Sequence, residues 1–146
     1  MYRFSRRSIN NMAGVHPALM TIFLEAIKDS PIDFGVPGDG GVRTAERQNE
    51  MFKDSKVKTN CDGYNKKSNH QIPEGEKYGK ALDFFAYLEG TGASWTEIHL
   101  AMVASHIMAT AKRLKREGKI SVEIKWGGTF GSVTFHGWDY PHIEIV

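Results

Sequence analysis

The chain has 146 residues, 40% of them hydrophobic and 25% charged, and its formal net charge at pH 7 is +2. This length suits one domain, residues 1–146, that buries a core without disulfide bonds, and the single cysteine, Cys61, excludes an internal disulfide. The composition is ordinary for a soluble enzyme.

Three arginines near the N-terminus are not followed by the apolar run that a secretory signal peptide needs. We therefore expect no signal peptide, and no stretch is apolar enough to predict a membrane span.

A second basic cluster comprises Lys112, Arg113, Lys115 and Arg116. Near the end of a predicted helix, these cations interact favourably with the helix dipole. Attraction to wall polymer or nucleic acid is the less favoured alternative, and we expect no nucleic-acid partner.

The first predicted helix follows Pro17, a residue suited to the first helical turn. Apolar side chains then recur at helical spacing, and the helix should end near Ser30-Pro31. Residues 34–36 predict a short strand. Thr44 is a candidate N-cap for a helix over 45–52, because its hydroxyl can accept a hydrogen bond from a free backbone amide.

Residues 54–80 are rich in Lys, Asn, Asp, Gly and Ser, and they predict a long loop. Such a loop is uncommon in a small domain unless it is functional. Residues 81–87 alternate as one strand, with Asp83 and Phe85 on one face.

Ser94 and Glu97 have the spacing of a capping box at the start of a long helix. That helix has one apolar face and should end at Gly118. Residues 120–124 and 142–146 predict the closing strands. The order of elements indicates an α+β fold in which helices pack against a small antiparallel sheet.

Most of the six histidines need no function. His99 and His106 lie seven residues apart on the long helix, roughly 10.5 Å along its axis, which is too far to share a metal directly. His16 precedes a helix and has a structural interpretation. His136 precedes the last motif, where contact with a substrate is conceivable but unsupported by any pattern.

The remaining two histidines stand in acidic and small-residue motifs. These motifs are Ser68-Asn69-His70, Gly79-Lys80-Ala81-Leu82-Asp83 and Asp139-Tyr140-Pro141-His142-Ile143-Glu144. In this order they resemble the D-alanyl-D-alanine carboxypeptidase family of zinc peptidases. Three further segments, 15–19, 30–34 and 41–44 followed by Gln48, resemble its phage endolysin branch, which cleaves the L-alanyl-D-glutamate bond. The resemblance runs from about residue 13 to the end.

The resemblance implies a single Zn²⁺ in a cleft, bound by His70, Asp83 and His142. Two imidazoles and one carboxylate leave a fourth position open, as catalytic zinc requires. Asp139 would be the general base. In an ideal strand Asp139 and His142 would face opposite ways, so we expect Tyr140-Pro141 to bend the chain and turn Asp139 toward the metal.

The resemblance also implies that Arg43 is a catalytic and substrate-binding residue, because a guanidinium can bind the substrate carboxylate or the developing oxyanion. Ser68 would assist substrate binding by hydrogen bonding. Glu144 should share a face with His142 and is a candidate to orient its imidazole; a solvated edge carboxylate is nearly as good an interpretation. Trp126-Gly127-Gly128 matches a segment near the cleft of the family.

One departure from the family is the stretch Gln71 to Tyr78, which separates His70 from Gly79. The family usually places glycine three residues after this histidine. The stretch carries Pro, Gly and charges and predicts an inserted surface loop, which costs little closure entropy.

The favoured function is a phage endolysin that hydrolyses the L-alanyl-D-glutamate bond of the peptidoglycan stem peptide. Two alternatives stay open: a D-Ala-D-Ala carboxypeptidase, and a non-catalytic zinc-stabilised module that binds the cell wall. An intact Asp139 argues against the binding module, which needs no base. We expect a monomer without membrane insertion, held in the host cytoplasm until a separate permeabilising protein releases it to the wall.

Overall fold

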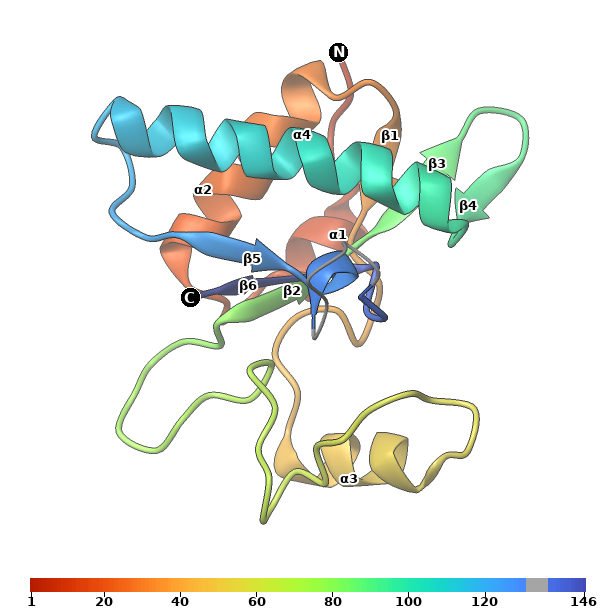
Figure 1. Cartoon of the computed structure of the whole chain (residues 1–146), viewed down its shortest axis with the longest axis vertical. Coiled ribbons are helices and arrows are strands. Elements are labelled where there is room, and N and C mark those ends of the chain that lie inside the picture. Colours follow the sequence, from red (N-terminus) through yellow and green to blue (C-terminus); the bar gives the residue numbers. More distant parts are fainter. Residues whose placement is uncertain (131–136) are drawn as a thin grey trace.

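The computed structural model describes residues 1–130 and 137–146, so that His136 lies outside the described residues (Figure 1). The helices and strands, in chain order, are α1 (Arg6–Asn11), α2 (Pro17–Ala26), the 3-10 helix η1 (Ile27–Asp29), β1 (Asp33–Gly35), α3 (Ala45–Lys53), β2 (Ala81–Asp83), β3 (Phe85–Leu88), β4 (Gly92–Ser94), α4 (Glu97–Arg116), β5 (Ile124–Trp126), the 3-10 helix η2 (Gly127–Thr129) and β6 (His142–Ile145). The α+β prediction is confirmed, with two small antiparallel sheets rather than one.

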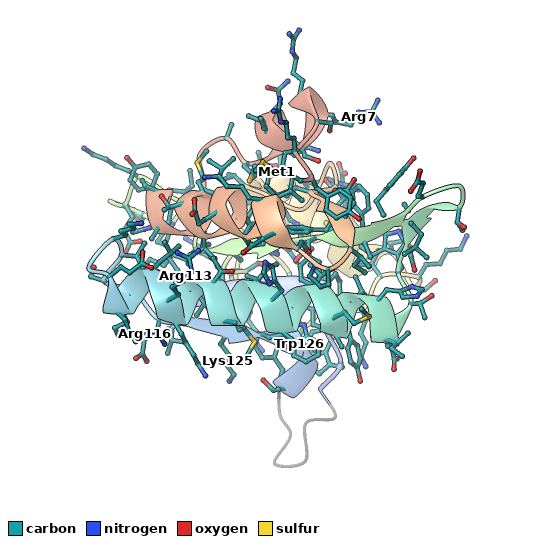
Figure 2. The ribbon with its side chains drawn as sticks, turned by 90° about the horizontal axis from the view of Figure 1, so that it is seen from above. Met1, Arg7, Arg113, Arg116, Lys125 and Trp126 are labelled. Atoms are coloured by element: carbon teal, nitrogen blue, oxygen red, sulfur yellow. The ribbon has the colours of Figure 1, made fainter. Side chains whose placement is uncertain are left out.

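Helices α2 and α4 lie side by side over the core (Figure 2). Their fully buried apolar side chains include Phe23 on α2 and Ile107 on α4. At the rim of this contact Arg113, on α4, pairs with Glu25 on α2 at 3.7 Å. No helix in the described part of the chain is both long and apolar enough to cross a bilayer.

The predicted capping box is wrong, although the long helix is present. The helix begins at Glu97 with Thr96 as its N-cap, so that Glu97 occupies the first helical position rather than the third. Ser94 instead belongs to β4, where it pairs with Ala86 of β3. Its hydroxyl lies 2.7 Å from Nδ1 of His99, which gives His99 a structural partner.

The single strand predicted over 81–87 is also wrong, because the chain changes sheets at Phe84. Strand β2 pairs with β6 in the sheet β2-β6-β5, whereas β3 lies between β1 and β4 in the other sheet. The backbone amide of Phe84 donates to the carbonyl of Pro141 at 2.8 Å. Its ring packs edge-on against Phe23 and Phe34 in the core, and this burial fixes the point where the strand breaks.

The long loop predicted over 54–80 is confirmed, since these residues contain no helix or strand. In the view of Figure 1 this loop and α3 lie below the sheet β2-β6-β5, while α4 crosses above it. The amide of Lys80 donates to the carbonyl of Asn69 at 2.9 Å. The chain therefore returns to its starting point after residues 72–78, which are exposed apart from a half-buried Pro73. This is the geometry of an inserted surface loop.

Of the two predicted closing strands, one lies where it was predicted and the other does not. Strand β6 occupies the predicted place, but β5 starts at Ile124, where the predicted strand 120–124 was meant to end. Helix α1 was not predicted. It is capped by Ser5, and Asn11 attaches it to the end of β1 by donating to the carbonyl of Val36 at 2.9 Å.

Candidate active site

Strand register brings two of the predicted ligands together. In the antiparallel pair of β2 and β6, Asp83 lies opposite His142, and Leu82 lies opposite Ile143. Leu82 and Ile143 are fully buried in the core. Because side chains alternate along a strand, Asp83 and His142 project from the other face, toward the loop side of the sheet.

His70 reaches the same point from the long loop. Its Nδ1 lies 2.9 Å from the carbonyl of Gly41, and its backbone amide donates to the hydroxyl of Ser68 at 3.2 Å. Its carbonyl accepts from the amide of Arg43 at 3.0 Å. The side chain is buried, so backbone and ring contacts together fix an imidazole that a polar loop would otherwise leave in solvent.

The three candidate ligand atoms form a nearly equilateral triangle. Nε2 of His70 is 3.1 Å from Oδ1 of Asp83 and 3.1 Å from Nδ1 of His142, and the last two atoms are 3.0 Å apart. A tetrahedral zinc ion with bonds of about 2.0–2.1 Å separates its ligand atoms by about 1.6 bond lengths, roughly 3.3 Å. The triangle therefore has the size of one face of a tetrahedral site.

In each of the two imidazoles one ring nitrogen donates a hydrogen bond, so that in a neutral ring the other nitrogen has a lone pair that can bind a metal. A carbonyl can only accept, so Nδ1 of His70 must donate to Gly41. Nε2 of His142 lies 3.0 Å from Oε1 of Glu144 and donates to that carboxylate. In neutral rings the lone pairs then face one another and Asp83. Three acceptors this close require a cation, and His70, Asp83 and His142 form a group that can hold a metal ion.

The pKa values of Asp83 and His142 also indicate that this group of side chains favours a positive charge. Burial raises the pKa of Asp83, but the charge of His70 and the hydrogen bonds from His142 and His70 outweigh burial and hold that pKa far below its usual range. Burial lowers the pKa of His142, yet its hydrogen bonds to Asp83 and Glu144 prevail and raise that pKa to about 10. Metal binding to such a site displaces a proton.

Arg43 fixes the other oxygen of Asp83. Its Nη2 donates to Oδ2 of Asp83 at 2.9 Å, its Nη1 to Oε1 of Gln48 at 3.1 Å, and its Nε to the carbonyl of Asp39 at 2.7 Å. Gln48 is fully buried and donates in turn to the carbonyl of Cys61 at 2.9 Å. The guanidinium thus holds Asp83 so that Oδ1 is left for the triangle, a role that sequence reasoning did not assign.

Asp139 lies beside the triangle without being part of it. Its Oδ2 is 3.8 Å from Nδ1 of His142. The chain bends before β6, as expected from Tyr140-Pro141, and the amide of His142 donates to the carbonyl of Asp139 at 3.2 Å. Burial, followed by the charge of Asp83, raises the pKa of Asp139. A carboxylate with a raised pKa is the better proton acceptor.

The Trp126-Gly127-Gly128 segment holds the bend in place. Nε1 of Trp126 donates to the carbonyl of Tyr140 at 2.7 Å, and the amide of Asp139 donates to the carbonyl of Gly127 at 3.2 Å. A Cβ atom on Gly127 would lie 2.0 Å from the carbonyl oxygen of Asp139. Glycine is therefore required at position 127 for the close approach that positions Asp139.

Two contacts complete the surroundings of His142. Glu144 accepts from His142, as expected, and it also accepts a short hydrogen bond from the side-chain amide of Asn69. Sequence reasoning missed Asn69, although it lies between Ser68 and His70 in the motif. Ser68 is half-buried at the cleft, where its hydroxyl oxygen accepts from the backbone amide of His70.

The candidate ligands, Asp139 and several of the residues that contact them line one cleft of about 400 Å³. From the sequence-predicted set it contains Arg43, Ser68, His70, Asp83, Asp139, His142 and Glu144. It also contains the aromatic side chains of Phe130 and Trp138. The other described histidines have structural partners elsewhere: Nδ1 of His16 caps α2 at 3.1 Å, and His106 contacts the carbonyl of Ala26 at 2.9 Å.

Comparison with known proteins covers the whole chain. A family model described as Phage L-alanyl-D-glutamate peptidase matches residues 1–146. The crystal structure of the Serratia marcescens L-Ala D-Glu endopeptidase ChiX is similar with a TM-score of 0.71 and 27% sequence identity, over 99% of this chain and 90% of that one. No curated protein matches. The similarity thus extends well beyond the segments that carry the cleft.

Proposed function

The chain belongs to the family of phage L-alanyl-D-glutamate peptidases, and we propose that it performs this hydrolysis with a zinc ion held by His70, Asp83 and His142. The family assignment gives the chain the activity of a peptidase that cleaves peptidoglycan, and the similar protein ChiX is an L-Ala D-Glu endopeptidase. The observation that carries the proposal is the triangle of ligand atoms with edges of 3.0–3.1 Å beside Asp139.

Zinc in this position would lower the pKa of its water to about 7 and polarise the scissile carbonyl. The chain's own residues supply the remaining chemistry. Asp139, at the edge of the triangle, accepts a proton from the attacking water and returns it to the departing amine of D-glutamate. This scheme needs no covalent enzyme intermediate.

We assign two functions to Arg43. Through its bond to Oδ2 of Asp83 it positions a ligand, and its N–H groups not used by Asp39, Gln48 and Asp83 remain for the substrate carboxylate or the developing oxyanion. Ser68, which lines the same cleft, is proposed to donate its hydroxyl hydrogen to the substrate.

The wider proposal is an endolysin in which residues 1–146 act as one monomeric domain on the bacterial cell wall. As a phage enzyme made inside its host, it would reach the wall after a separate protein permeabilises the membrane. Neither alternative drawn from the sequence gains support from the comparisons. A D-Ala-D-Ala carboxypeptidase would act on another bond, and a binding module would not use the proton acceptor at Asp139.

The first prediction concerns zinc. Protein purified and dialysed against zinc is expected to hold about one zinc ion per chain, and a chelator should abolish peptidoglycan cleavage in a manner that zinc reverses. Elemental analysis and a turbidity assay on purified cell walls measure the two quantities. Full cleavage by metal-free protein would refute the zinc proposal while leaving the peptidase assignment intact.

The second prediction concerns Arg43→Lys. One ammonium group keeps the charge but cannot replace a fork that donates to Asp39, Gln48 and Asp83 together. Since residues that support a metal ligand typically contribute ten- to a hundredfold, we expect kcat/KM to fall by about that factor. Arg47→Lys is the matched control, because Arg47 is exposed and pairs with Asp39 and Glu50. Equal kcat/KM values for the two variants would show that Arg43 has no role in the site.

A further inference from the structure

The cleft is lined by charges of opposite sign that come from different segments of the chain. Asp83, Asp139 and Glu144 gather around His142, at 3.0 Å, 3.8 Å and 3.0 Å from its ring nitrogens. The loop wall contributes three lysines, Lys58, Lys66 and Lys67. A ligand that fills the cleft therefore meets carboxylates at the catalytic end and ammonium groups along the loop.

The ammonium groups of these three lysines can bind an anionic ligand. Each is exposed, and among residues 1–130 and 137–146 no carboxylate lies within 4.0 Å of any of them, whereas Arg43 in the same cleft is paired with Asp83. The ammonium group of Lys58 lies 5.2 Å from the centre of the Trp138 ring. This cation–π contact holds Lys58 against Trp138, the residue that precedes Asp139.

The chemistry of the substrate supplies a matching negative charge. Glutamate has two carboxyl groups, and when its nitrogen is acylated by L-alanine only one of them can continue the stem peptide. The other is a free carboxylate unless it is amidated. Near Asp139 and Glu144 this group would be repelled, so the favourable orientation points it toward the loop wall.

We propose that Lys58, Lys66 and Lys67 form the subsite for the free carboxylate of the D-glutamate residue. They make the enzyme selective for stem peptides that carry this carboxylate over those that carry a carboxamide at the same place. The inference rests on the proposed function and names the part of the substrate that determines specificity. Arg43, already engaged with Asp83, then need not be the main carboxylate receptor.

The test compares two synthetic peptides containing the L-alanyl-D-glutamate bond, one with the free carboxylate and one with the carboxamide. Zinc-loaded wild-type protein is expected to show a KM roughly five- to tenfold lower for the carboxylate peptide, since an exposed ion pair contributes up to about fivefold and more than one lysine takes part. Substituting Lys58, Lys66 and Lys67 together by Gln should raise the KM for the carboxylate peptide to that for the carboxamide peptide.

The matched control replaces Lys53, Lys77 and Lys112 by Gln, because these lysines are exposed, lie outside the cleft and change the net charge equally. It should keep the wild-type preference. A wild-type enzyme with equal KM values for both peptides, or a cleft variant that keeps the preference, would overturn the lysine subsite alone. If wild-type protein cleaved neither peptide, the proposed function would fail and the subsite with it.

Discussion

Replacing Asp139 by Asn is expected to lower kcat for peptidoglycan cleavage by roughly a hundredfold to ten-thousandfold, the usual contribution of a general base. Asn is nearly isosteric and keeps the backbone bonds to Gly127 and His142, but its amide cannot accept the proton. Zinc content and thermal stability should change little, because Asp139 is 3.8 Å from His142 and outside the ligand triangle. Asp139→Glu should retain part of the activity, because it keeps a carboxylate that can accept the proton, although the added methylene must be accommodated.

Asp33→Asn is a suitable control for this experiment. Burial raises the pKa of Asp33 as it does that of Asp139, but Asp33 lies on β1 outside the cleft. The control should cleave at the wild-type rate. If Asp139→Asn kept full activity, Asp139 would not be the base; if it lost zinc, Asp139 would have to be a ligand.

Replacing His142 by Ala is expected to abolish both tight zinc binding and activity. A residue that only supports a zinc ligand contributes ten- to a hundredfold in affinity, so loss of the ligand should cost more than about a hundredfold. The variant removes one corner of the triangle and leaves Asp83 paired with Arg43. Competition with a chromophoric chelator measures the zinc affinity, and circular dichroism reports the fold.

His99→Ala provides the comparison, because His99 contacts Ser94 at the start of α4 and not the cleft. It should bind zinc with wild-type affinity. Wild-type zinc affinity in His142→Ala would mean that the ion lies elsewhere and that the triangle is held together by hydrogen bonds alone.

Local patterns predicted those elements whose residues carry their own signals. Pro17 and the apolar spacing after it were sufficient for α2, and Thr44 was recognised as the N-cap of α3, where its hydroxyl accepts from the amide of Arg47 at 3.0 Å. The break at Phe84 had no local signal. Alternation continues through this position, and the strand changes sheets because the Phe84 ring is packed between Phe23 and Phe34, which come from distant parts of the chain.

In the candidate site, too, the features with a local sequence signal were predicted and those that depend on distant residues were not. The motifs placed all of the proposed ligands and the proposed base in one cleft. Its supporting contacts were not predictable, because they join residues far apart in sequence: Arg43 to Asp83, Asn69 to Glu144, and Gly127 to Asp139. Lys58, Lys66 and Lys67 were not predicted either, because the loop that contains them is rich in lysine and its sequence does not single these three out.

The most direct test of zinc-dependent hydrolysis at the L-alanyl-D-glutamate bond is mass spectrometry of the fragments released from purified peptidoglycan by zinc-loaded and metal-free protein. The proposed function predicts fragments that begin with D-glutamate, from the zinc-loaded protein alone. Release of D-alanine in their place, or the same D-glutamate fragments from metal-free protein, would contradict it.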